Sequence, residues 1–446
     1  MASNQHNDLV MLNRFRVHDI NEDDLFQVIY VLSRKTSNLT VDEPGDNQQL
    51  LNDARRLELL VKKIGISTAD EVLSELVTAL CQLEYSYNDT LLSIQLLGIG
   101  KAAIFASSSS ACIAEHVEML VKLLVKFVTD QQRVHVCRQA LFALANLLYL
   151  SPTVHSHIQN QLPDLVGCFK PIKDDEAAAT YALTCLVNIS RTTDIRTYLG
   201  KEGVCKAVTN AFFNYPLNDT VYIYLFMAIG NLSYHCIENL NRFVKQGFMQ
   251  AMLQCLEGSA PPLVSRSCVY ALTLCLYTTA HIKPLLCNVE TAHIIANTLQ
   301  RYEGQVDIVL FTLHIVRLIS VHDTIGNRIW NCTVLFDVLL RLVEFDTDQQ
   351  EDTNVSYSER ESRRLSRVRL ESETVQIQTL KTITSMCRSY PSKTRRRLLH
   401  RLGYAELLDR VVLDRADFRD GVLKAEVQDV VRSVGKQKGC VLWMCK

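Results

Sequence analysis

One apolar pattern returns along the chain at near-regular intervals, and it restricts the possible folds more than any other feature. Four segments share the pattern, ALFALANLLYL, ALTCLVNIS, LFMAIGNLS and ALTLCLYTT, which begin at Ala140, Ala182, Leu225 and Ala271. Weaker copies begin at Phe311 and Thr379. In each copy the apolar residues follow helical spacing, so the chain is predicted to repeat one helical unit.

The length of the unit follows from one reference position, that of Asn146 in the first copy. Its counterparts in the later copies are Asn188, Asn231, Tyr277, Arg317 and Ser385. The steps between them are 42, 43, 46, 40 and 68 residues. The first four steps fall in the range of about 40–47 residues that is typical of units with two or three helices.

A glycine marks the second half of the unit. Lys201-Glu202-Gly203-Val204 follows Asn188, and Lys245-Gln246-Gly247-Phe248 holds the matching place after Asn231. Gly403 lies similarly in the last copy. Glycine adopts the left-handed conformation that turns one helix into another. We therefore predict a unit of long helix, short helix, glycine turn and middle helix.

This combination resembles the armadillo family of beta-catenin and importin alpha. The resemblance rests on Asn-Leu-Ser near the end of a long helix, followed by a helix that ends in (Lys/Gln)-(Glu/Gln)-Gly. It is good over residues 133–260 and looser over 261–345 and 371–413. It implies an all-α, armadillo/HEAT-type α-solenoid, a right-handed superhelix with a concave groove lined by the long helices.

The repeats do not account for the whole chain. We expect a helical N-terminal cap over 1–86, about six to seven repeats over 87–413, and a capping helix with a tail over 414–446, because solenoid ends need polar caps. The polar segment 346–370 interrupts the apolar pattern and is predicted to be a surface insertion.

Composition and motifs argue against several function classes. The 47 basic and 48 acidic side chains leave a net charge of −1, which argues against bulk binding to nucleic acid or membranes. The 15 cysteines form no CxxC motif, and neither HExxH nor GxSxG occurs. We predict no enzyme, no cofactor and no metal site. Without a signal core or a long apolar run we expect a cytoplasmic protein, with the nucleus as an alternative.

Three asparagines at the reference position are the first candidate site residues. The armadillo resemblance implies that Asn146, Asn188 and Asn231 clamp the backbone of an extended peptide, because an amide both donates and accepts hydrogen bonds. The alternative is that they bond the backbone of the neighbouring repeat. One turn earlier, where importin alpha carries a tryptophan, this chain has Phe142, Thr184 and Met227. That departure argues against recognition of nuclear localisation signals.

Tyrosines form a second candidate set on the same helical stripe. Tyr181, Tyr224 and Tyr270 lie seven residues before the reference position, and Tyr277 occupies it. Groove tyrosines would suit a partner with apolar or proline-rich character. The alternative is that they pack the junctions between helices.

Other candidates lie towards the C-terminus. Arg363-Arg364-Leu365-Ser366 resembles a basophilic kinase site, which makes Ser366 a candidate phosphosite. The last repeat carries a basic patch that is either a solvated helix face or a surface for an acidic partner, at Lys393, Arg395, Arg396, Arg397 and Arg401. Acylation of Cys440 or Cys445 would anchor the tail to a membrane.

These features lead to one main hypothesis about function. We expect a protein–protein interaction scaffold that binds an extended partner segment in the concave groove. The alternative on the same fold is a nuclear-transport-type adaptor or a small-GTPase regulator. An enzyme with a non-obvious site is a third, weaker hypothesis.

Overall fold

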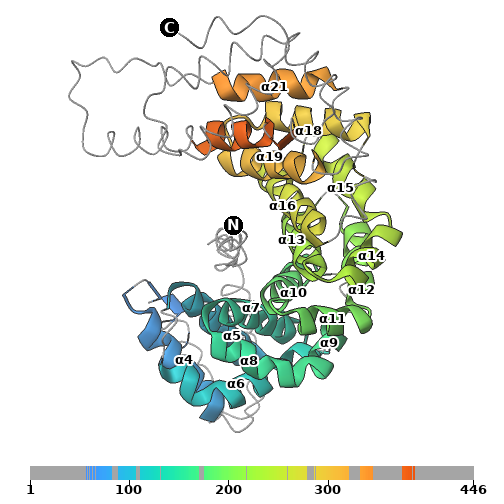
Figure 1. Cartoon of the computed structure of the whole chain (residues 1–446). Helices are drawn as coiled ribbons and strands as arrows, with labels where there is room; N and C mark the ends of the chain where they lie inside the picture. Colours follow the sequence, from blue (N-terminus) through green and yellow to red (C-terminus); the bar gives the residue numbers. More distant parts are fainter. Residues whose placement is uncertain are drawn as a thin grey trace, which may run out of the picture. The chain divides into compact units, whose positions relative to one another are not determined.

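A computed structural model places most of the repeats (Figure 1). It describes residues 57, 59, 61, 62, 64, 65, 67–82, 89–106, 111–130, 132–169, 175–216, 218–258, 260–278, 286, 288–320, 332–344, 374–383, 385 and 386. These residues form helices, turns and bends without a strand. The chain divides into two compact units, Met1–Gln246 and Gly247–Lys446.

The first unit is built from layers of helices. Its long helices are α5 (Asp89–Phe105), α7 (Val134–Leu150), α10 (Glu176–Ile189) and α13 (Asp219–Ser233). Its middle helices are α4 (Ala69–Gln82), α6 (Ala111–Thr129), α9 (Leu162–Phe169) and α12 (Val204–Asn214). The short helices are α8 (Pro152–Ile158), the 3-10 turn η2 (Gln159–Gln161), α11 (Thr193–Lys201) and α14 (Ile237–Lys245).

Helices of the same kind stack on one another in this unit. The long helices pack in the order α5, α7, α10, α13, and the middle helices in the order α4, α6, α9, α12. The core lies between the layer of long helices and the layer of middle helices. Parts of the long helices are buried on every face. Residues 139–148 of α7 and 182–189 of α10 are buried without interruption. A helix that is covered on all sides must be apolar all round, which explains the near-continuous apolar runs of the repeat.

Polar caps set where the long helices begin. The Asp175 carboxylate accepts a hydrogen bond from the amide of Ala178 (3.0 Å) at the start of α10. Asn218 caps α13 in the same way through the amide of Val221 (2.9 Å). Each side chain accepts from one of the backbone N–H groups that the first helical turn leaves unbonded.

The predicted glycine turns are confirmed. Gly203, between α11 and α12, has φ 87°, and Gly247, directly before α15, has φ 77°. Both values lie in the left-handed region, which a residue with a Cβ occupies only at a cost. The sequence of long helix, short helix, glycine and middle helix is therefore present as predicted.

The second unit continues the same plan. Its described middle helices are α15 (Phe248–Glu257), α18 (Val289–Arg301) and α21 (Thr333–Glu344), and its long helices are α16 (Pro262–Thr278) and α19 (Val306–Ser320). α16 packs on α19, α15 packs on α18, and α18 packs on α21. Residues 374–383 are helical, and Thr382 Oγ1 donates a hydrogen bond to the carbonyl of Leu313 in α19 (3.4 Å).

These elements make an all-α solenoid with an armadillo-like repeat of three helices. The contacts between repeats show the same period as the sequence. Asn188 bonds Ala145, Arg191 bonds Leu148 and Asn239 bonds Arg196, each 43 residues away. Among the described residues, no helix is long and apolar enough to cross a membrane.

Several predicted features lie outside the described residues. These are most of the cap at 1–86, the insertion at 346–370, the tail at 414–446, and Gly403. Ser366, the basic patch from Lys393 to Arg401, Cys440 and Cys445 also lie outside the described part, and their proposed roles stay predictions.

Candidate interaction surface of the long helices

The three reference asparagines lie at the junctions between long helices. Asn188 Nδ2 donates to the carbonyl of Ala145 in α7 (2.9 Å), and Asn231 Nδ2 donates to the carbonyl of Val187 in α10 (2.9 Å). Asn146 Nδ2 donates within its own helix, to the carbonyl of Phe142 (3.2 Å). Asn146, Asn188 and Asn231 are 1%, 0% and 6% exposed.

For Asn188 and Asn231, but not for Asn146, this placement matches the alternative that the amides bond the neighbouring repeat. Asn188 and Asn231 use their amide N–H groups to join consecutive repeats, and a buried amide that lost its partner would cost about 1–3 kcal/mol. Their role as clamps on a partner's backbone stays a prediction.

The residues one turn before the asparagines are also buried. Phe142, Thr184 and Met227 are at most 1% exposed. Thr184 Oγ1 donates to the carbonyl of Thr180 (2.8 Å) in its own helix. These positions therefore contribute to packing of the long helices in the chain as described.

The tyrosine set is divided between packing and surface. Tyr224 and Tyr270 are buried, and the Tyr270 ring meets Phe311 edge-on at a centroid distance of 5.6 Å. Tyr181 and Tyr277 are half-buried, and the Tyr181 ring lies 5.2 Å from that of Phe142. Only Tyr181 and Tyr277 thus present part of their rings to a partner.

A set that the sequence analysis missed lies three residues after each asparagine. Tyr149, Arg191 and Tyr234 are half-buried and lie 42 and 43 residues apart. Tyr149 is in the last turn of α7, Arg191 follows the end of α10 at Ile189, and Tyr234 directly follows α13. We call these three residues the terminal stripe. The sequence could have indicated this set, because the third residue after each reference asparagine is a tyrosine or an arginine in three consecutive repeats.

Neighbouring contacts fix the orientation of the stripe. Arg191 Nη2 donates to the carbonyl of Leu148 (2.9 Å) in the preceding long helix. The Arg196 guanidinium lies over the Tyr234 ring, 5.6 Å from its centroid, and burial raises the pKa of the Tyr234 hydroxyl. Arg196 itself is buried and donates to the carbonyls of Ser190 and Arg191, both at 3.0 Å.

In the second unit the reference positions carry a different set. Tyr277 Oη bonds His314 Nε2, and His314 Nδ1 bonds Arg317 Nη2. Arg317 Nη1 donates to Gln378 Oε1 (3.4 Å) in the helical segment 374–383. We call Tyr277, His314, Arg317 and Gln378 the polar cluster, and all four are half-buried.

The pKa values in the polar cluster follow from its burial. Burial, followed by the charge of Arg317, lowers the pKa of His314 to about 3, so the ring is neutral at physiological pH. Burial also lowers the pKa of the Arg317 guanidinium. Because the neutral ring accepts from Arg317 at Nδ1, its proton is on Nε2 and is donated to Tyr277 Oη.

Three thiols of the first unit, those of Cys137, Cys168 and Cys205, are poor nucleophiles. Burial raises the pKa of Cys137 to about 11 and the pKa of both Cys168 and Cys205 to about 12. Only the thiolate reacts or binds metal readily, so these side chains act as small apolar residues at neutral pH. The described residues contain no group of three or more His, Cys, Asp and Glu placed to hold a metal ion.

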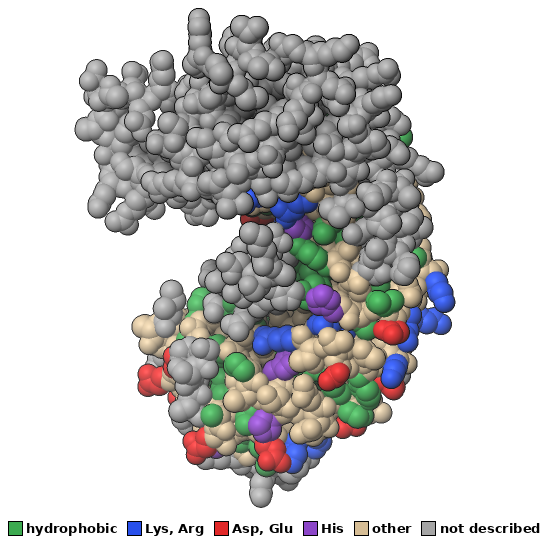
Figure 2. Space-filling model, in the orientation of Figure 1, with side chains coloured by type: hydrophobic (Ala, Val, Ile, Leu, Met, Phe, Trp, Pro, Cys, Tyr) green, Lys and Arg blue, Asp and Glu red, His purple; other side chains and the backbone are tan. Residues whose placement is uncertain are grey.

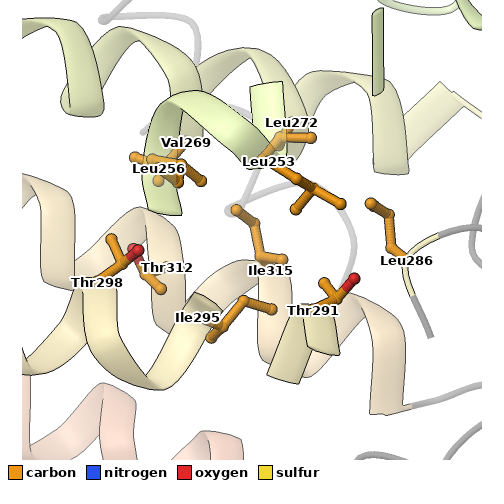
Figure 3. Close-up of a pocket in the computed structure, with 10 residues that line it drawn as sticks. All are labelled: Leu253, Leu256, Val269, Leu272, Leu286, Thr291, Ile295, Thr298, Thr312 and Ile315. Atoms are coloured by element: carbon orange, nitrogen blue, oxygen red, sulfur yellow. The ribbon is translucent and has the colours of Figure 1, made fainter. Parts of the chain in front are cut away.

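The surface over the first unit's long helices is mixed in character, and the second unit holds a small cavity (Figures 2 and 3). Figure 2 shows basic and histidine side chains beside apolar ones over α7, α8 and α10. A cavity of about 10 Å³ between α15, α16, α18 and α19 is lined by apolar side chains and threonines such as Leu256, Ile295 and Thr312 (Figure 3). It is about large enough for one water molecule and too small for an organic ligand.

Comparison with known proteins bears on the fold. No protein-family model and no curated protein matches the chain. Among solved structures, an engineered protein of the Northeast Structural Genomics Consortium is 15% identical, with a TM-score of 0.60, over 97% of this chain and 99% of its own.

Two designed proteins show a weaker likeness. The designed armadillo repeat protein YIII(Dq)4CqI is 17% identical over 55% of this chain and 99% of its own, with a TM-score of 0.45. A second, YIII(Dq.V1)4CPAF in complex with the peptide (KR)4, is 20% identical over 56% of this chain and 98% of its own, with a TM-score of 0.40.

Proposed function

We propose that this chain is a protein-interaction scaffold whose long-helix face holds an extended segment of a partner protein. The observation that carries the proposal is the terminal stripe, in which Tyr149, Arg191 and Tyr234 lie at matching places in three consecutive repeats, at or just beyond the C-terminal end of the long helix. Tyrosine and arginine are among the residues that most often dominate binding energy at protein interfaces.

The geometry of stacked helices suits an extended chain. Packed helices lie about 8–10 Å apart, and an extended peptide advances about 3.3–3.6 Å per residue. Consecutive members of the stripe therefore match about every second to third residue of a partner.

A scaffold also suits the chemistry of the described side chains. The thiols of Cys137, Cys168 and Cys205 are protonated at neutral pH, and His314 is neutral and engaged on both ring nitrogens. We propose a reducing compartment such as the cytoplasm, because the ten described cysteines are thiols rather than disulfides.

Affinity capture from the source cell, read by mass spectrometry, tests the proposal. One bait is the natural chain, and a second carries Tyr149→Ala, Arg191→Ala and Tyr234→Ala. A matched control carries Lys206→Ala, Asn210→Ala and Phe213→Ala, three exposed residues of α12. Circular dichroism verifies that all three baits keep their helicity.

The expected result is a partner that the natural and control baits capture and the stripe variant loses. A photo-crosslinking residue at position 234 should then attach to one continuous segment of that partner. Capture of the same partners by all three baits would refute the stripe as the working surface. If the partner is a small GTPase bound in only one nucleotide state, the scaffold acts as a regulator of that GTPase.

A further inference from the structure

The second unit carries an arginine that binds only neutral groups among the described residues. Arg317 contacts His314 Nδ1 and Gln378 Oε1, and no carboxylate lies within ion-pair distance of it in the described part of the chain. Other arginines on long helices differ in this respect. Arg138 pairs with Asp175 (Nε to Oδ2, 2.9 Å) and Arg266 pairs with Asp307 (2.8 Å).

The surroundings of Arg317 orient its guanidinium. The group has five N–H donors in a planar fork, and two of its nitrogens are directed at His314 and Gln378. His314 is in turn bonded to Tyr277, and the two rings lie 5.1 Å apart between centroids. The groups of the cluster therefore belong to α16, α19 and the segment 374–383, three elements of one unit.

We infer that Arg317, with Tyr277 beside it and His314 holding both in place, forms a binding site for a carboxylate, supplied by an Asp or Glu side chain of an acidic partner segment. This inference rests on the proposed scaffold function and names the chemistry that this part of the surface selects. A carboxylate would accept charge-assisted hydrogen bonds from the N–H groups of the half-buried guanidinium. Such bonds are about twice as strong as neutral ones.

Electrostatics favour an anion over a neutral or basic group at this place. The side chain of Arg317 is partly withdrawn from water, which lowers its pKa and strengthens its attraction for an opposite charge. His314 is neutral, so the site carries one positive charge and suits one carboxylate. Tyr277 and Arg317 occupy the reference position on neighbouring long helices, and both side chains are half-buried, unlike the buried asparagines at that position in the first unit.

Fluorescence anisotropy with the full chain tests the site. The probes are two fluorescein-labelled peptides on one Gly-Ser framework, with glutamate at every third position in one and glutamine in the other. The proteins are the natural chain, Arg317→Gln, and Arg341→Gln as a matched control, since Arg341 is an exposed arginine of α21 in the same unit. Thermal unfolding establishes that each variant is folded.

The natural chain and Arg341→Gln should bind the glutamate peptide about tenfold more tightly than the glutamine peptide at low salt, a preference of about 1.4 kcal/mol. Arg317→Gln should lose that preference, and Arg317→Lys should keep part of it because the charge remains without the fork. Added salt should reduce the preference.

Two outcomes would overturn the inference. One is equal affinity of the natural chain for both peptides, and the other is an unchanged preference in folded Arg317→Gln. Failure of the scaffold proposal is separate, because it is measured by capture with the terminal stripe variant in the first unit. If the chain prefers the glutamate peptide but captures no partner, the carboxylate site is supported and the scaffold proposal is refuted.

Discussion

At the scale of single residues, buried polar groups join the repeats to one another. Asn188 and Asn231 each donate one hydrogen bond to the preceding long helix, and Asn239 donates to the carbonyls of Arg196 (2.7 Å) and Leu232 (3.0 Å). These bonds satisfy amides that would otherwise be buried without partners, and they fix the register of one helix on the next.

Replacing Asn188 with alanine should therefore reduce stability. The substitution removes the bond to the Ala145 carbonyl and leaves a small void in a fully buried position, which we expect to cost about 1–3 kcal/mol. Urea unfolding measures the loss. Asn210→Ala, at an exposed site on α12, is the matched control and should change stability by less than about 0.5 kcal/mol. Equal effects of the two substitutions would contradict a junction role for Asn188.

The polar cluster should make stability depend on pH. The folded-state pKa of His314 is about 3, below the usual value of 6.5. As pH falls below 6.5, His314 is protonated in the unfolded chain but stays neutral in the folded chain. The contribution of His314 to stability therefore declines between about pH 6.5 and 3. The free-energy difference between the natural chain and His314→Gln should shrink over this window.

Unfolding at a series of pH values measures that difference. His293→Gln, at an exposed position of α18, serves as control and should show no such trend. A difference between the natural chain and His314→Gln that stays constant from pH 7 to pH 4 would show that His314 is not held neutral.

At the scale of helices, the closest approach lies between α11 and α14. A Cβ built on Gly200 would lie 1.7 Å from Asn239 Oδ1 and 2.8 Å from Arg242 Nη1. Both helices pack on each other, and the absent side chain lets Asn239 reach the backbone of the preceding repeat. Gly167 in α9 has nothing within 4 Å of its built Cβ.

The two glycines should consequently respond in opposite directions to alanine. Gly200→Ala displaces Asn239 and is expected to destabilise the chain by about 2–4 kcal/mol. Gly167→Ala should stabilise it by about 0.5–1 kcal/mol, because alanine is the better helix former and meets open space. Thermal or urea unfolding of both variants decides the matter, and destabilisation by both would count against the close approach of α11 and α14.

Helices were also the level at which the sequence was most informative. The apolar copies and the Gly203 and Gly247 turns identified the repeat, because both depend on local backbone preferences. Burial of Thr184 was not predictable, since periodicity marks apolar residues and not the neutral polar ones that neighbours cover. The contact of Tyr277 with His314 joins residues 37 positions apart and required the packing of α16 on α19.

At the scale of the whole molecule, the described repeats of each unit pack on their sequence neighbours. The long helices contact the long helices before and after them, and the middle helices do the same within each unit. Stability in such an array is a sum of terms for single repeats and for nearest neighbours. A local defect should therefore loosen nearby repeats before it affects distant ones.

Leu183→Ala provides the test of that local behaviour. Leu183 is fully buried in α10, between α7 and α13, and its truncation should cost about 2–5 kcal/mol. Hydrogen exchange read by mass spectrometry should show faster exchange in α7, α10 and α13 and unchanged exchange in α18 and α19. The reciprocal substitution Leu313→Ala, at a buried site of α19, should reverse the pattern. Uniform acceleration along the chain in both variants would mean that it unfolds as one cooperative body, because only global opening exposes all helices equally.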